Sequence, residues 1–130
     1  MKFLVDSDWV IDHLRGKEEI RLKLKEFLPF GIGISVISVA ELYEGIFYSK
    51  NPDQAQDKLE TLLTLFSILG IEQEVCKVFG RERGNLRKQG RIIDNFDLLI
   101  ASTALHYGLI LLSNNQRHFE RIERLKIVST

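Results

Sequence analysis

The sequence has little cysteine and little proline. Its 130 residues include a single cysteine and 2 prolines. One cysteine excludes an internal disulfide framework and a cysteine-cluster zinc site, and in the helical pattern "EQEVCKVFG" we expect Cys76 to be a small buried core residue. With 45% hydrophobic residues, the composition is that of an ordinary globular protein without a disordered tail or linker.

Long apolar runs are also missing. The longest stretches, such as "LLIASTAL" and "LILL", are far shorter than the roughly 20 residues that a membrane span requires. The N-terminus lacks the pattern of a signal peptide. We therefore expect a cytoplasmic protein without a membrane segment.

Net charge is absent as well, because 18 basic residues balance 18 acidic ones. A strongly basic domain gathers nucleic acid through its overall field, so binding here would have to come from local patches. The best candidate is "KVFGRERGNLRKQGR", which contains Arg83, Arg87 and Arg91. A solvated helix face is the alternative interpretation of this segment.

Short apolar runs alternate with amphipathic segments along the chain. Strands are expected at 2–6, 31–36, 109–113 and 125–129, and helices at 7–16, 18–29, 38–45, 51–69, 71–90, 94–108 and 115–122. Strands separated by helices favour a parallel sheet that is covered on both faces. The prediction is one α/β domain over residues 1–130, with a mostly parallel sheet of roughly four or five short strands flanked by helices.

Several carboxylates lie at the ends of these expected elements. Asp6 ends the first strand, where reactive groups gather in open parallel sheets. Glu41 could complete a capping box that begins at Ser38, and Asp94 could cap a helix in which Asp97 is the third residue. Taken singly, Glu41, Asp94 and Asp97 have this structural explanation.

Taken together, these acids indicate a shared site, which capping alone would not explain. An α/β sheet could bring Asp6, Glu41 and the Asp94/Asp97 pair to one edge, and capping does not require that convergence. Two carboxylates about 4 Å apart repel by roughly 4 kcal/mol at an effective dielectric near 20. Clustered oxygen ligands without cysteine suit a hard divalent cation, Mg²⁺ or Mn²⁺, better than zinc.

Four segments together resemble a known family. They are "FLVDSDWVIDHLRG", "SVISVAELYEG", "IIDNFDLLIASTALHYGLILLSNN" and "RHFERIERLKI". In this order, from near residue 2 to near residue 127, they resemble the PIN-domain family and, more narrowly, the VapC-type toxins of toxin–antitoxin pairs. The resemblance implies a single PIN-like domain and a metal-dependent endoribonuclease that cleaves structured RNA with Mg²⁺ or Mn²⁺.

The resemblance also implies roles for particular residues. Asp6, Glu41 and Asp97 match the catalytic, metal-binding acids, and Asp94 would help directly or through a metal-bound water. Asn115 stands where many relatives have a further acid, so it would be a neutral metal ligand, hold a water, or simply form a turn.

The partners implied by the resemblance are macromolecules. The RNA substrate would meet Arg83, Arg87 and Arg91 through its phosphates. A small VapB-type antitoxin would wrap the helices near "ISVAELYEGIFYSKN" and insert a basic side chain into the acidic site. A homodimer is expected too.

Two other interpretations remain open from the sequence. The Asp-x-Asp in "FLVDSDWV" resembles the nucleophile motif of haloacid-dehalogenase-type phosphatases, in which Asp6 would be phosphorylated and Asp8 would act as the acid. A catalytically inactive PIN module that only binds a partner or RNA is the other. The histidines carry no predicted chemistry: His106 is expected to be a packed or surface helix residue and His118 a structural part of the late turn.

Overall fold

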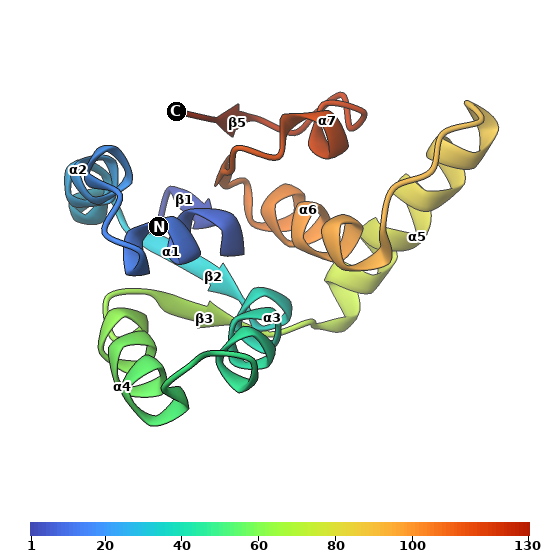
Figure 1. Cartoon of the computed structure of the whole chain (residues 1–130). Helices are drawn as coiled ribbons and strands as arrows, with labels where there is room; N and C mark the ends of the chain where they lie inside the picture. The colour runs from blue at the N-terminus through green and yellow to red at the C-terminus, as the bar shows by residue number, and fades with distance from the viewer.

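A parallel sheet forms the centre of the fold. The computed structural model describes the whole chain, residues 1–130, and contains a 5-stranded sheet in the order β3-β2-β1-β4-β5 (Figure 1). The strands are β1 Phe3–Val5, β2 Ile32–Ser35, β3 Ser67–Leu69, β4 Ile110–Leu112 and β5 Ile127–Val128. Every neighbouring pair is parallel, with Val5 opposite Ile34 on one side and Leu112 on the other. All carboxyl ends therefore lie along one edge of the sheet.

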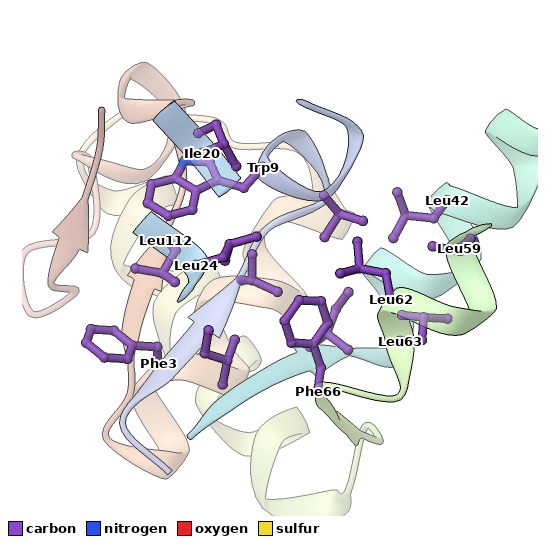
Figure 2. Close-up of a cluster of buried hydrophobic side chains, with 14 residues drawn as sticks. Phe3, Trp9, Ile20, Leu24, Leu42, Leu59, Leu62, Leu63, Phe66 and Leu112 are labelled. Atoms are coloured by element: carbon purple, nitrogen blue, oxygen red, sulfur yellow. The ribbon is translucent and has the colours of Figure 1, made fainter. Parts of the chain in front are cut away.

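Side chains alternate between the two faces of this sheet and build two separate cores. Phe3, Val5 and Leu112 belong to the first core, whereas Leu4 and Leu111 belong to the second. This alternation is the period of two that pleated strands impose. Figure 2 shows the first core, in which leucines of the flanking helices meet the strands. Because both faces are buried, the strands are apolar throughout, as the sequence predicted.

Seven α-helices cover the sheet on both faces, which confirms the predicted α/β class. They are α1 Ser7–Leu14, α2 Glu18–Phe27, α3 Val36–Phe47, α4 Pro52–Leu63, α5 Gln73–Lys88, α6 Asn95–Tyr107 and α7 Gln116–Phe119. Helices α1, α2 and α4 pack into the first core, and α5, α6 and α7 into the second. None of them combines the length and the apolar character needed to cross a membrane.

One strand was missed in the sequence because its approach resembles a helix. The apolar residues Leu62, Leu63 and Phe66 are all buried and keep helical spacing beyond the end of α4. The chain nevertheless turns, and β3 pairs with β2 as the edge strand, with Ile68 opposite Ile34. The predicted helix over 51–69 was therefore wrong in its last third, where tertiary pairing overrides the local period.

The end of α6 agrees with the sequence, whereas the cysteine of α5 does not. Gly108, the last residue of the helix predicted over 94–108, ends α6 in the left-handed conformation, φ 65°. Cys76 is exposed, so the expectation of a buried cysteine was wrong. Its neighbour Val75 is the residue that faces the core, and the next position on a helix points about 100° away.

Helix α2 offers a matched pair of leucines that tests this packing. Leu24 is 3% exposed in the first core, whereas Leu22 is 52% exposed on the same helix. Leu24→Ala should lower the free energy of unfolding by about 2–5 kcal/mol, because it removes buried methyl groups and leaves a cavity. Leu22→Ala should cost less than about 1 kcal/mol in the same urea titration. Equal losses would contradict the arrangement.

Candidate active site

Asp6 follows β1 directly and lies at the carboxyl edge of the sheet, as predicted. Its residue surface is 4% exposed. The Ser113 hydroxyl donates to Oδ2 at 2.8 Å, and the backbone N–H of Ser7 donates to Oδ1 at 2.8 Å, so Asp6 also caps α1. Burial, followed by the charge of Asp8, raises the pKa of Asp6 to about 7, with a smaller contribution from the charge of Asp97. These hydrogen bonds therefore compensate only part of the cost of burial.

Glu41 lies within α3 and is not part of a capping box, so that interpretation was wrong. The helix begins at Val36, and its cap is Ser35, whose hydroxyl accepts from the Ile37 N–H at 3.1 Å. Ser38 is buried inside the helix and its hydroxyl has no hydrogen-bond partner. Glu41 is thereby free of any capping role.

The Glu41 carboxyl is electrostatically strained. Its Oε1 is buried without a hydrogen-bond partner. Burial raises the pKa of Glu41, and the charges of Asp97 and then Asp94 raise it further. An unpaired buried carboxyl oxygen of this kind is costly unless a cation or a donor meets it.

Asp94 and Asp97 lie at the start of α6 and do different things. Asp94 is the cap, as predicted: its Oδ2 accepts from the N–H groups of Phe96 at 3.0 Å and Asp97 at 3.4 Å. Asp97 is the third residue of the helix but does not reach back to the cap. Its Oδ2 instead lies 2.7 Å from Nδ1 of His118.

The structure brings the predicted acids of three elements together. Asp97 is close enough to Asp6 and to Glu41 for its charge to raise the pKa of both. Helices α3 and α6 are also in contact (Figure 1). No three His, Cys, Asp or Glu side chains are close enough to form a ready metal cage. The arrangement is thus a set of converging carboxylates, each still separate from the others.

The late turn is tied to the same edge of the sheet. The backbone N–H of Asn115 donates to the Ser113 hydroxyl at 3.0 Å, and its side-chain amide lies 3.0 Å from Nδ1 of His118. The indole N–H of Trp9 donates to Oδ1 of Asn114 at 3.2 Å, and the N–H of Asn114 donates to Asp8 at 2.8 Å. The turn is therefore fixed on α1. Asn115 is near the site, and its role as a metal ligand stays a prediction.

His118 is the residue that the sequence did not single out. It was expected to be only a structural part of the turn, yet its ring contacts an acid of the site. The signal available in the sequence was weak: a histidine in a short helix after a strand, followed by an apolar Phe119. No residue near His118 in the sequence indicates its partner Asp97, which lies in another helix.

The three predicted RNA contacts differ in their surroundings. Arg83 donates to the carbonyl of Ile93 at 3.1 Å and also binds the side chain of Asn95. It thus secures the loop that leads to Asp94. Arg87 and Arg91 are exposed and form no ion pair.

A groove of about 400 Å³ lies beside the acids, between α1, α3 and α4. Its apolar lining includes Ile11, Leu14 and Ile46, and Glu41 forms part of its wall. Leu42 also lines the groove, but it is 4% exposed and belongs to the first core. The groove therefore joins an apolar surface to the acidic site.

Comparison with known proteins agrees with this geometry. The PIN domain family matches residues 3–125. Ribonuclease VapC2 of Haemophilus influenzae is 40% identical over 126 residues, which cover 97% of this chain and 96% of that protein. The tRNA(fMet)-specific endonuclease VapC of Shigella flexneri is 29% identical, over 97% and 96% of the two chains.

A solved structure shares the whole fold. The crystal structure of VapBC2 from Rickettsia felis, bound to a DNA fragment from their promoter, superposes with a TM-score of 0.93 and 30% identity. The alignment covers 100% of this chain and 99% of the other. The predicted fold is thereby confirmed as a single PIN-fold domain with a parallel sheet. The chain belongs to the PIN-domain family and, within it, to the VapC group.

Proposed function

We propose that the chain is a metal-dependent endoribonuclease, the toxin of a VapBC-type pair, which cleaves structured RNA in the cytoplasm. The observation that carries the proposal is the convergence of Asp6, Glu41 and Asp97 at the carboxyl edge of the sheet, with raised pKa values at Asp6 and Glu41. Acids with strongly perturbed pKa values cluster at functional sites. The names and activities of the VapC relatives support the same reaction class.

A divalent cation fits the residues that are present. Carboxylate oxygens are the donors at this edge, and Oε1 of Glu41 is buried without any partner. Such a donor set suits Mg²⁺ or Mn²⁺. We assign Asp6, Glu41 and Asp97 as the principal ligands. Asp94, which caps the helix of Asp97, and Asn115, whose N–H donates to Ser113, would assist directly or through water.

The chemistry divides between the cation and the protein. When bound, a divalent cation polarises the phosphoryl oxygen and lowers the pKa of an attacking water. The Ser113 hydroxyl and the Ser7 N–H hold the Asp6 carboxylate in a fixed orientation. Asp94 caps α6 and thereby fixes the backbone that presents Asp97. A fixed carboxylate set reduces the reorganisation needed during the reaction.

RNA must approach a site that is itself acidic. Arg87 and Arg91 are exposed on and beside α5 and are the better phosphate contacts of the three predicted arginines. Arg83 acts mainly on the loop before α6, because two of its donors are already used there. Shape and exposed bases, rather than groove readout, would select the RNA. Transfer RNA is the natural first substrate, given the Shigella flexneri relative.

A VapB-type antitoxin is the proposed inhibitory partner. The apolar groove between α1, α3 and α4 would accept an amphipathic segment, and Glu41 in its wall would attract a basic side chain of that segment. Phe47 and Tyr48, both 78% exposed, lie at the end of α3 and extend this surface. A homodimer is also proposed, as the family resemblance implies.

The phosphatase alternative is less consistent with the site. It needs the Asp8 carboxyl as a mobile acid, yet both of its oxygens accept backbone N–H groups, from Trp9 and Asn114, at 2.8 Å. The inactive-module alternative differs from our proposal only in chemistry, so an activity assay separates the two.

The first prediction concerns cleavage. Purified chain free of antitoxin should cut transfer RNA with Mg²⁺ or Mn²⁺ and lose this activity in EDTA. Asp6→Asn should reduce the rate roughly 100-fold or more, because it removes several kcal/mol of transition-state stabilisation. Asp53→Asn, an exposed acid in the first turn of α4, is the matched control and should retain activity. Cleavage by the Asp6 variant at the wild-type rate would contradict the proposal.

The second prediction separates the two acids of α6. Asp97→Asn should abolish cleavage, whereas Asp94→Asn should only weaken it. Asparagine is as good a helix cap as aspartate, so the latter variant should also keep its stability within about 0.5 kcal/mol. Primer extension on the cut RNA and urea unfolding measure the two effects. If both variants cut as fast as wild type, this assignment is wrong.

The third prediction concerns the metal-free protein. The folded pKa of Asp6 is about 7, above the 3.8 of a free aspartate carboxyl, so unfolding releases a proton at pH values between these two. Stability in EDTA should therefore fall as the pH rises from 4 to 7. At pH 8, Asp6→Asn should be more stable than wild type, by at most about 4 kcal/mol.

Added Mg²⁺ should make wild type more stable than Asp6→Asn, which is the reverse of their order in EDTA. The cation should raise the melting temperature of wild type and leave that of the Asp6 variant nearly unchanged. Thermal unfolding at several pH values measures both effects. If the melting temperature of wild type changes with neither pH nor Mg²⁺, the raised pKa of Asp6 and its relief by the cation are refuted.

A further inference from the structure

His118 and Asp97 form a hydrogen bond between two helices that the proposed chemistry has not used. Nδ1 of His118 lies 2.7 Å from Oδ2 of Asp97. The Asp97 side chain is 15% exposed and the imidazole is 47% exposed. The bond therefore links a largely covered carboxylate to a ring at the surface.

Core packing holds this pair in place. Leu98 follows Asp97 and Phe119 follows His118, and both apolar side chains are fully buried in the same core. Each polar partner is the third residue of its helix. The buried neighbours therefore hold the backbones of Asp97 and His118 close to each other.

The contacts around Nδ1 determine its protonation. An ionised carboxylate can only accept a hydrogen bond, so Nδ1 must carry the proton and donate it to Asp97. Nδ1 then cannot also accept from the Asn115 amide at 3.0 Å. The amide oxygen of Asn115 must therefore face the ring. This requires only a 180° turn of the side-chain amide.

We propose that His118 is a positioning residue for Asp97. Its Nδ1–H holds Oδ2, so Oδ1, for which the protein supplies no hydrogen bond, is the oxygen left for the cation. This inference rests on the proposed function. Removing the hydrogen-bond partner of a metal ligand typically lowers metal affinity or activity 10–100-fold.

Substitutions that move the donor test the idea. His118→Asn keeps an N–H donor at the position of Nδ1, whereas His118→Gln presents it near the position of Nε2. His118→Ala removes it altogether. His106→Ala is the matched control, because His106 is an exposed histidine of α6 whose ring makes an edge-to-face contact with Tyr107.

Metal affinity is the first measurement, read as free Mn²⁺ by electron paramagnetic resonance. The apparent dissociation constant should rise about tenfold in His118→Ala and His118→Gln, and stay within about twofold of wild type in His118→Asn and His106→Ala. Cleavage should follow the same order, with kcat reduced and the KM for RNA unchanged. Equal Mn²⁺ binding by wild type and His118→Ala would overturn the positioning role.

A spectroscopic measurement tests the bond without metal or substrate. Long-range ¹⁵N–¹H correlations of the metal-free protein should show a protonated Nδ1 at His118. An unprotonated Nδ1 would overturn the inference. If wild type neither binds Mn²⁺ nor cuts RNA, the proposed function fails and this inference falls with it. If wild type does both while His118→Ala matches it, only the positioning role is wrong.

Discussion

The Asp6 carboxylate is buried at the end of the central strand, and its electrostatic cost governs the rest of the site. Two hydrogen bonds, from Ser113 and from the Ser7 N–H, orient it, yet its pKa still rises to about 7. Added apolar contacts would deepen that cost, because the remedy for a buried carboxylate is charge or hydrogen bonding. Glu41 carries the same strain with a buried oxygen that has no partner. The protein thus tolerates local instability where a ligand would relieve it.

The strand order explains why this strain is concentrated at one place. From β1 the chain builds outward through β2 and β3, then returns through α5 and α6 to β4 on the other side of β1. The direction of winding therefore reverses between β1 and β4, where open α/β sheets form a crevice. Asp6 and Ser113 are the first residues after these two strands. Their hydrogen bond joins the ends of the two strands, and the returning helix α6 brings Asp97 near enough for its charge to raise the pKa of Asp6.

Sequence reasoning succeeded where the cause is local and failed where it is tertiary. Asp6 after an apolar strand, Asp94 as a cap and Gly108 as a stop follow from rules that need only a few neighbouring residues. Strand β3 was missed because the apolar spacing before it continues a helical period. The capping interpretation of Glu41 failed because Ser35 starts the helix earlier than Ser38 could. The contact of His118 with a partner 21 residues away has no local signature. The convergence of Asp6, Glu41 and Asp97 could be inferred from sheet topology, and their catalytic role stays a prediction.

The asparagine at position 115 is compatible with the hydrogen bond between His118 and Asp97. A carboxylate at position 115, as the family resemblance leads one to expect, would face the imidazole as an acceptor beside Asp97. It would compete for the single Nδ1–H that Asp97 now receives and would add a further negative charge to acids that already raise one another's pKa. The amide oxygen of Asn115 is a weaker acceptor than a carboxylate and adds no charge, and the backbone N–H of Asn115 still ties the turn to Ser113. In this chain, the late turn therefore contributes to the site by orienting the existing acids, while the negative charge remains with Asp6, Glu41, Asp94 and Asp97.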